Sequence, residues 1–467
     1  MAARLLPALL FVNGLILSAA AEERPNILFI AIDDLNDWVG CLGGHPQAIT
    51  PQIDRLAAEG MNFTNAHCQA PICNCSRVSL LLGKYPSTTG IYFLAPDFRR
   101  SDRTQNDITL PQYFRSHGYY TSARGKIFHG KPDQVSFNHI EPESGWRRNR
   151  KKLNYTVEGS NPLWDWGSVD VPDADHVDFR TAEWAAQQLP KLAARQQPFF
   201  LSVGFHLPHV PIYASRKWFE HPPLETVQLP KVLATDRDDL SDHAIKLTLN
   251  PTAPRHEWMV SHNQWAQAVQ AYLAATAFID SLVGMLLDAL KDSGAEQNTI
   301  VVLWSDHGFH LGEKQRWAKR TLWEETTRVP LIIKTPNLNP GRCDHPVGLI
   351  DLFPTLTDLC GLPEKQGLEG HSLTQLLRNP KTEWMHSAIT TFGPGNDTVR
   401  TSRWRYIRYA DHSEELYDHS TDPDEWHNIA GNPTSAEVIA QLRSLLPQNP
   451  VPPASGSKGA DSPLYPE

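Results

Sequence analysis

Acidic residues follow two apolar runs that lie far apart in the chain. Asp33 and Asp34 come directly after the run 26–32, and Asp306 and His307 follow a second run. Continuous apolar runs of this kind are typical of strands buried on both faces of a parallel sheet. Because ligands bind beyond the carboxyl ends of such strands, we expect these side chains to meet at one edge. An isolated Asp-Asp pair is more often a cap or a solvated loop, but with Asp306 it predicts a metal site, whose oxygen ligands suit Ca²⁺.

Further residues with catalytic chemistry are grouped in short segments between these runs. Cys73 and Arg77 are one helical turn apart in the segment 70–86. Lysines and arginines neutralise anions, and imidazole titrates near neutral pH, so their combination suits acid–base work on an anionic substrate. Outside a motif, each cation would be a surface charge. The lysines and histidines lie in Gly125-Lys126-Ile127-Phe128-His129, His206-Leu207-Pro208-His209 and Trp317-Ala318-Lys319.

The segment 70–86 resembles the sulfatase signature, in which Cys or Ser is followed by x-Pro-x-Arg and then by a Leu-x-x-Gly helix. The resemblance extends over most of the chain, through the segments named above and Ser305-Asp306-His307-Gly308. It is greatest to the iduronate-2-sulfatase branch, because two residues separate Lys126 from His129 and Asp306 is followed by His307. Choline-sulfatase-like relatives share the Asp-His pair.

This resemblance implies a fold, a reaction and a modified nucleophile. The fold is alkaline-phosphatase-like α/β, with a large, mostly parallel sheet flanked by helices and a small C-terminal α+β subdomain. The reaction is hydrolysis of a sulfuric ester on a sulfated saccharide. Cys73 would be converted to formylglycine by a formylglycine-generating enzyme, and its hydrate would attack sulfur to give a covalent sulfo-enzyme. One Ca²⁺ per chain would be bound by the modified residue together with Asp33, Asp34, Asp306 and His307.

The resemblance also implies roles for the remaining site residues. Lys126 and Lys319 would neutralise sulfate oxygens, and Arg77 would hold the environment of the nucleophile. His129 is the candidate base for the elimination step. Either His209 or Lys319 would protonate the leaving oxygen. His206 is expected to pack or hydrogen-bond near the site without a catalytic role.

One position departs from the family pattern. Cys75 stands where the family has Pro, in the short motif that converting enzymes read in the unfolded chain. A disulfide to Cys73 or Cys68 is an alternative fate for this thiol, although a Cys-x-Cys bridge is strained. Two other functions therefore stay open, a phosphate or phosphonate ester hydrolase of the same superfamily and a glycan-binding pseudosulfatase. Ser76 is disfavoured as a nucleophile, because no Gly-x-Ser-x-Gly elbow surrounds it.

The elements that must position these residues alternate along the chain. Apolar strand candidates at 26–32, 198–204, 299–304 and 329–334 alternate with amphipathic stretches at 50–59, 76–82, 110–117 and 264–292, which predicts an α/β sheet. Short strand-like pieces at 388–392, 404–409 and 415–418, followed by a helix near 435–446, predict a small antiparallel sheet. The predicted divisions are a catalytic domain (24–380), a C-terminal subdomain (381–447) and a disordered, Pro- and Ser-rich tail (448–467).

Composition and the N-terminus predict the compartment and exclude some partners. Residues 1–21 have the pattern of a secretory signal peptide, with Arg4 before an apolar run and small residues at 19–21. We therefore expect an extracytoplasmic protein without a stable membrane anchor, since that run is too short to span a bilayer. The net charge of −9 makes nucleic acid an unsuitable partner. The six cysteines are too few for a disulfide scaffold.

A basic run at 147–152 has two interpretations. It is either a solvated loop or, with the aromatic residues Tyr155, Trp164 and Trp166, a subsite for a sulfated sugar that bears a uronate.

Overall fold

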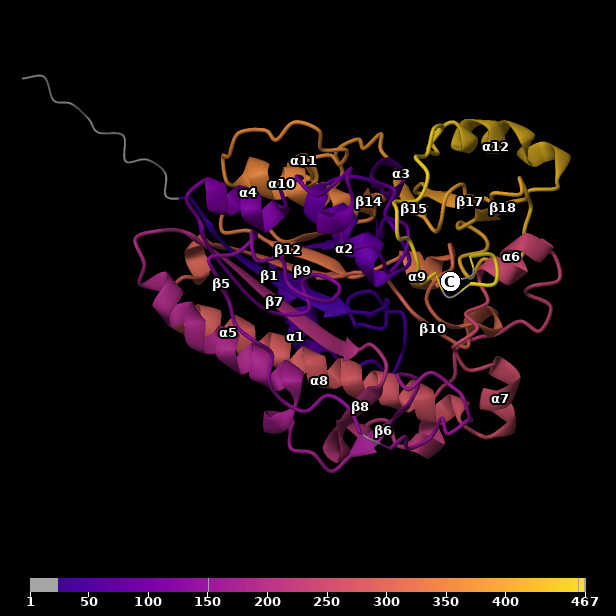
Figure 1. Cartoon of the computed structure of the whole chain (residues 1–467), viewed down its shortest axis with the longest axis horizontal. Helices are drawn as coiled ribbons and strands as arrows, with labels where there is room; N and C mark the ends of the chain where they lie inside the picture. The colour runs from indigo at the N-terminus through magenta and orange to yellow at the C-terminus, as the bar shows by residue number, and fades with distance from the viewer. Residues whose placement is uncertain (1–23, 150, 461, 466–467) are drawn as a thin grey trace, which may run out of the picture.

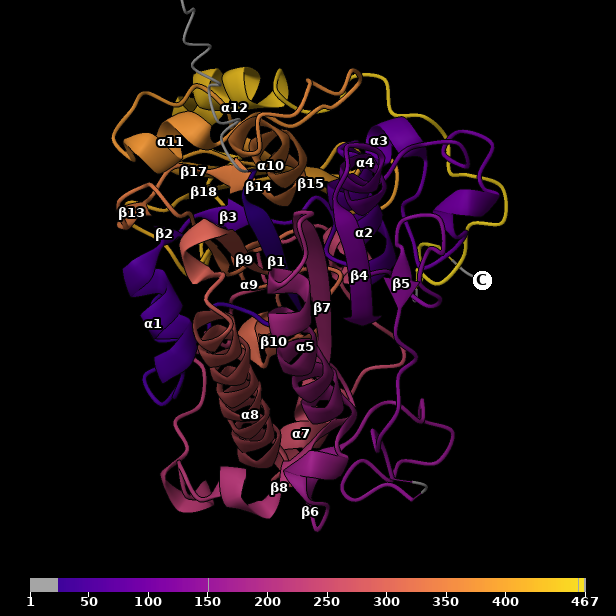
Figure 2. The same cartoon turned by 90° about the vertical axis from the view of Figure 1, so that its left-hand side faces the viewer.

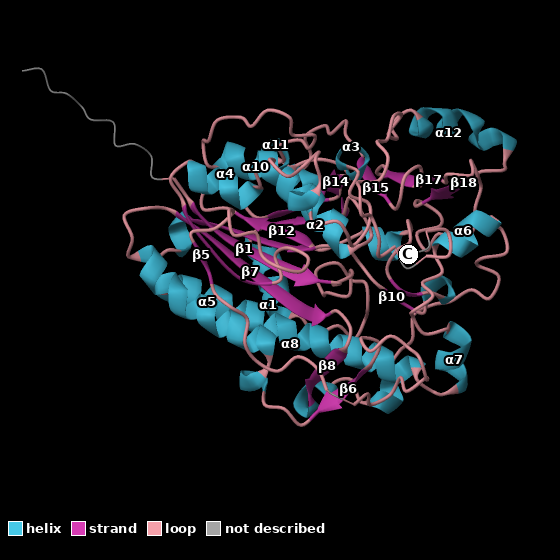
Figure 3. Cartoon of the chain, in the orientation of Figure 1, coloured by secondary structure: helices cyan, strands magenta, loops and turns pink. Residues whose placement is uncertain are grey.

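A twisted eight-stranded sheet forms the centre of the computed structural model, which describes residues 24–149, 151–460 and 462–465. Figure 3 shows the strands as a layer between helices. The strand order is β13-β2-β12-β9-β1-β7-β4-β5. The bounds are β1 (Asn26–Asp33), β2 (Met61–Phe63), β4 (Tyr120–Gly125), β5 (His139–Ile140), β7 (Phe199–Pro208), β9 (Thr299–Ser305), β12 (Leu331–Lys334) and β13 (Gly341–Cys343). The predicted signal peptide lies outside the described residues.

The central strand β1 pairs in parallel with both β7 and β9. These three strands are the apolar runs of the sequence, and they are buried because helices cover both faces of the sheet. Strand β12 runs antiparallel to β9 and gives the sheet a mixed edge. The predicted fold class, a mostly parallel α/β sheet flanked by helices, is confirmed.

Alternate residues of β1 belong to two separate apolar cores, one on each face of the sheet. Ile27, Phe29 and Ala31 pack with one set of helices, whereas Leu28 and Ile30 pack with the other. Figures 1 and 2 show these two helical layers. The first comprises α2 (Cys73–Leu82), α4 (Leu110–Ser116) and α10 (Leu352–Leu359), and the second comprises α1 (Pro51–Glu59), α5 (Val177–Ala193) and α8 (Trp265–Asp292).

Helix α8 is the one helix in the described part of the chain that is long and apolar enough to cross a membrane. It lies against α5 and β7 instead, and 78% of its most apolar window is buried within the protein. Its hydropathy therefore reflects its place in the core.

A second, antiparallel sheet follows the main domain, in the order β15-β16-β17-β18. Its bounds are β15 (Ala388–Thr391), β16 (Asp397–Arg400), β17 (Trp404–Arg408) and β18 (Glu414–Asp418). Helix α12 (Ala436–Arg443) packs on it through Ile439 and Leu442. Strand β16 was not predicted, because Asp-Thr-Val-Arg contains a single apolar residue and does not stand out from a turn.

The segment 448–467, which is predicted to be disordered, makes backbone hydrogen bonds to the main domain in the part that the structure describes. Backbone bonds join Val451 to Ser87 at 2.9 Å and Ala454 to Gly90 at 2.8 Å. Composition predicted disorder because Pro and Ser bury little apolar surface. The described part of the segment is held instead by backbone hydrogen bonds to Ser87 in α3 (Pro86–Thr89) and to Gly90, which ends this helix.

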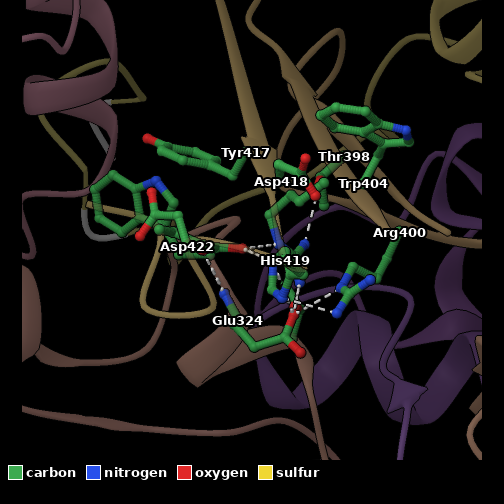
Figure 4. A network of polar contacts seen from close by, with 12 residues as sticks. Glu324, Thr398, Arg400, Trp404, Tyr417, Asp418, His419 and Asp422 are labelled. Carbon is green, nitrogen blue, oxygen red and sulfur yellow. Dashed lines mark hydrogen bonds and ion pairs between the residues drawn. The ribbon is translucent and has the colours of Figure 1, made fainter. Parts of the chain in front are cut away.

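Buried charges join the small sheet to the main domain (Figure 4). Arg405 is fully buried and contacts both Glu324, at the start of α9 (Glu324–Thr327), and Glu425. His419 accepts a hydrogen bond from Arg400 at Nδ1 (2.8 Å) and donates from Nε2 to Glu425 (2.9 Å). Both ring nitrogens are therefore engaged, and His419 is part of a network of charged side chains that includes Arg400 and Glu425.

Candidate active site

The first site residues lie where β1 ends. Asp33 closes the strand, and Asp34 turns the chain with a φ of 63°. This left-handed turn is held because the Tyr272 hydroxyl donates to the Asp34 carbonyl (2.7 Å) and the Asp34 N–H donates to Asp306 Oδ1 (3.1 Å). The two distant acidic motifs thus meet at one edge of the sheet, as expected from the strand ends.

Cys73 is the first residue of α2 and is almost completely buried. Its Sγ lies 3.0 Å from Lys319 Nζ, 3.2 Å from His307 Nε2 and 3.7 Å from Lys126 Nζ. The helix N-terminus adds a positive partial charge at the same point. Burial by itself raises the pKa of the thiol, but Lys126, Lys319, His307 and a hydrogen bond from His129 lower it well below its usual range. The position therefore favours a negatively charged group.

Three carboxylates and an imidazole surround this thiol in the geometry of a cation site. One ligand atom each of Asp33, Cys73, Asp306 and His307 lies within 4.8 Å of the others. Asp34 Oδ2 is buried without a hydrogen-bond partner among the described residues, which leaves it a free ligand atom. His307 Nδ1 is engaged by the Gly308 carbonyl (3.1 Å), so Nε2 faces the cluster. This oxygen-rich donor set fits Ca²⁺.

Arg77 lies behind the carboxylates. Its Nε donates to Asp306 at 2.8 Å and its Nη2 to Asp33 at 3.1 Å, and all three side chains are fully buried. Its remaining nitrogen contacts the carbonyls of Lys126 and Ile127. Arg77 therefore orients the acidic ligands and the segment after β4, and reaches the thiol only through its charge.

The cationic side chains are each held by a carboxylate. Lys319 Nζ donates to Asp34 Oδ1 at 2.6 Å, and Lys126 Nζ contacts Asp33. Lys319 projects inward from a tight turn in which Ala318 and Arg320 have φ values of 82° and 76°. Such left-handed residues are uncommon and cluster at functional sites.

Two further predicted residues line the space beside the thiol. His209 Nδ1 contacts its neighbour's carbonyl at 2.6 Å, and burial lowers the pKa of His209 from its ordinary value. One of its ring nitrogens lies within 4.8 Å of ligand atoms of Asp33, Asp34 and Cys73. His129 lines the same space beside Cys73 as His209.

The comparisons with known proteins decide the family. The sulfatase family profile matches residues 25–362, which is most of the chain. The chain belongs to the sulfatase family. A second profile, of the C-terminal region of N-sulphoglucosamine sulphohydrolase, matches residues 312–450. The predicted family and enzyme class, a sulfuric ester hydrolase, are confirmed.

Two relatives of this sulfatase match most of its length. It is 39% identical to a sulfatase of Formosa agariphila over 91% of this chain and 87% of that one. It is 33% identical to human iduronate 2-sulfatase over 73% and 70% of the two chains.

Among solved structures, a protein in complex with D-glucosamine-2-N,6-O-disulfate superposes with a TM-score of 0.72 at 22% identity, covering 91% of this chain and 97% of that one. A phosphonate monoester hydrolase from Silicibacter pomeroyi superposes with a TM-score of 0.75 at 20% identity, covering 90% and 94%. At these identities the likeness shows the shared fold.

A cavity of about 560 Å³ opens from the thiol of this sulfatase. Lys126, Lys319 and His209 lie among its lining residues together with a wall formed by Arg124, Glu141, Glu143, Arg147 and His206. Arg124, Glu141 and Glu143 were not predicted, because no motif marks them and the two glutamates belong to the irregular segment after β5. His206 hydrogen-bonds Glu143, as expected for a residue that packs near the site.

The basic run at 147–152 is mostly a solvated loop. Arg148 and Lys151 are exposed, and Lys152 bonds Ser160 at 2.7 Å. Of the described residues in this run, Arg147 lines the cavity. All six cysteines are free thiols. Cys75, which lies within α2, donates a hydrogen bond to the Tyr92 carbonyl at 3.1 Å.

Proposed function

We propose that this sulfatase releases sulfate from a sulfated saccharide, with Cys73 converted to formylglycine as its nucleophile and Ca²⁺ as its metal ion. The observation that carries the proposal is the surrounding of Cys73, which lies within 3.7 Å of two lysines and one histidine at a helix N-terminus. An anionic ester brought to this point meets positive charge from several directions.

Conversion of Cys73 would supply a hydrated aldehyde, whose hydroxyl is a better nucleophile toward sulfur than a side-chain alcohol. Cys75 replaces the motif Pro, but it lies inside α2 with its thiol turned to the Tyr92 carbonyl. The substitution therefore bears on recognition of the unfolded chain by a formylglycine-generating enzyme and leaves the folded site's ligands in place.

Asp33, Asp34, Asp306 and His307, with the converted residue 73, would hold Ca²⁺, which when bound would acidify the attacking hydroxyl and neutralise a sulfate oxygen. Arg77 would keep Asp33 and Asp306 in position, since it donates to both. This arrangement is preorganised, because the carboxylates are fixed before substrate arrives.

In this proposal the two lysines bind sulfate oxygens and the two histidines transfer protons. Lys126 and Lys319 would hold the non-bridging sulfate oxygens, and their own carboxylate partners fix the two ammonium groups beside residue 73. His129, next to Cys73, is the proposed base that accepts a proton in the elimination step. His209 is the proposed acid at the leaving oxygen, and a lowered pKa makes its protonated form a stronger acid.

Relatives and the cavity support a saccharide substrate. One relative is an iduronate 2-sulfatase, and a structural neighbour was solved with a sulfated glucosamine. A cavity of about 560 Å³ has the volume for a sugar residue. The leader-like segment 1–21 supports an extracytoplasmic location.

The test is mass spectrometry of the peptide that contains Cys73, from protein made with a formylglycine-generating enzyme, together with sulfate release from 4-nitrophenyl sulfate and sulfated sugars. We expect loss of sulfur, gain of a carbonyl oxygen and release of sulfate. Cys73→Ala should abolish turnover, whereas Ser76→Ala should retain most of it. An unmodified Cys73 in a chain that binds sulfated glycans without releasing sulfate would establish the pseudosulfatase alternative.

A second candidate reaction is hydrolysis of a phosphonate or phosphate ester. The likeness in fold to a phosphonate monoester hydrolase supports it, and a lysine-rich site also suits phosphonate oxygens. Paired assays with 4-nitrophenyl sulfate, phosphate and phenylphosphonate would separate the two. Faster turnover of the phosphorus ester would replace the sulfatase proposal.

A further inference from the structure

The cavity wall beyond the catalytic residues contains two pairs of opposite charge. Glu143 Oε1 lies 2.5 Å from His206 Nε2. Glu141 Oε1 lies 3.8 Å from Arg124 Nη1, and Arg124 Nη2 donates to Ser144 at 2.9 Å. Arg124 precedes Lys126 by two residues at the end of β4, so the wall adjoins the proposed sulfate position.

Exposure differs sharply within each pair. The side chains of Arg124 and His206 are only 6% and 8% exposed, whereas those of Glu141 and Glu143 are 33% and 42% exposed. Arg124 and His206 are therefore the buried supports of the two carboxylates. A bound molecule first meets Glu141 and Glu143, together with the half-buried Arg147 on the same wall.

The state of Glu143 follows from its neighbours. Burial raises its pKa, but the hydrogen bond from His206 and the charges of His206, Arg147 and Arg124 outweigh burial and leave it below its ordinary value. An ionised carboxylate accepts hydrogen bonds and donates none. It attracts hydroxyl groups and repels a second anion placed against it.

We propose that Glu141 and Glu143 are specificity-determining residues that accept hydrogen bonds from free hydroxyl groups of the sugar that carries the sulfate. This inference rests on the proposed function and narrows its substrate class to a sulfated sugar without a second anionic group at this wall. Arg124 and His206 are positioning residues that hold the two carboxylates. A preference for a uronate-bearing sugar, which is one interpretation of the basic run at 147–152, would be the opposite result.

The experiment compares two substrates that share the sulfated position, a methyl hexopyranoside 2-sulfate and the corresponding hexuronoside 2-sulfate, with 4-nitrophenyl sulfate as reference. Fully converted wild-type protein should show kcat/KM at least about tenfold higher for the neutral hexoside, which is the effect expected of hydrogen bonds to charged groups. Glu143→Gln and Glu141→Gln should narrow this ratio and should lose more activity on the hexoside than on the aryl ester.

Two further variants separate recognition from general damage. His206→Gln should also reduce the ratio of kcat/KM between hexoside and uronoside, because the Glu143 carboxylate loses its hydrogen bond to His206. This change should lie in KM and not in kcat. Arg148→Gln removes a charge from the exposed part of the same segment and should leave the ratio unchanged. Wild-type preference for the uronoside, or an unchanged ratio in both Gln variants, would overturn the assignment. Absence of sulfate release from every ester, despite conversion of Cys73, would instead overturn the proposed function and this inference with it.

Discussion

Lys319 Nζ lies 3.0 Å from Cys73 Sγ, although 246 positions separate the two residues in the chain. The same ammonium group donates to Asp34 at 2.6 Å, so its position is fixed from two sides. Burial lowers the pKa of Lys319, but the charges of Asp34 and Cys73 outweigh burial and raise it above the ordinary value. These neighbouring charges therefore favour the protonated ammonium form of Lys319.

Lys319→Ala should reduce kcat on 4-nitrophenyl sulfate by about 10²–10³-fold, the effect of removing one preorganised charge from a transition state. Lys319→Arg should recover little, since a larger, planar guanidinium cannot replace an ammonium group that lies 2.6 Å from Asp34 and 3.0 Å from residue 73. Steady-state kinetics on fully converted protein measure this. Lys151→Ala, on an exposed loop, is the control, and a Lys319→Ala variant within threefold of wild type would refute the role.

Chelation should remove activity and Ca²⁺ should restore it. Asp34→Asn should lower calcium content, because Asp34 belongs to the ligand cluster and its Oδ2 is a buried carboxylate oxygen without a hydrogen bond to any described residue. Atomic emission on purified protein provides the metal count independently of activity. Asp37→Asn is the matched control, since Asp37 pairs with Arg328 at 3.0 Å and is absent from the ligand cluster. Equal calcium in all three proteins would exclude Asp34 as a ligand.

Arg405→Met should destabilise folding by about 3–5 kcal/mol, because it leaves Glu324 and Glu425 buried without a guanidinium that contacts both. Urea denaturation followed by tryptophan fluorescence gives the free energy of unfolding. Arg342→Met removes an exposed ion pair with Asp344 and should leave stability essentially unchanged. Similar stability of the two variants would show that the buried network contributes little.

Asp351 should make stability depend on pH. Burial raises its pKa from 3.8 to about 7, although it accepts backbone hydrogen bonds from Gly348 and His371 at 2.8 Å. A raised acid pKa favours folding most below the unfolded value, so this contribution is lost as pH rises from about 4 to about 7. Asp351→Asn mimics the protonated form. The stability of wild type relative to this variant should fall across that window, and a constant difference would contradict the assignment.

Deletion of residues 450–467 should lower the melting temperature by several degrees. The segment bonds Ser87 and Gly90, and Tyr92 donates to the Val451 carbonyl at 2.7 Å. Limited proteolysis should become faster near 91–98, the loop that this segment covers. Ser455→Ala, at an exposed position, is the control, and unchanged melting and cleavage in the deletion would mean that these bonds are dispensable.

The sequence by itself determined the enzyme family and the core of the sheet, and it selected the candidate site residues. Asp33, Cys73 and Asp306 could be selected because each ends a buried strand or begins a helix in a recognisable motif, and strand ends must meet at one edge. Local rules also gave α8 and the three central strands, since their apolar periodicity is long enough to be unambiguous.

The tertiary structure alone decided what short or irregular segments do. Glu141 and Glu143 carry no motif, and their proximity to His206 and Arg124 depends on how an irregular segment folds back on β4 and β7. The position of 451–460 was decided in the same way, because its backbone hydrogen-bond partners Ser87, Gly90 and Ala95 lie more than 350 positions earlier in the chain. Composition describes what a segment can bury by itself, whereas these contacts arise only after distant parts of the chain have met.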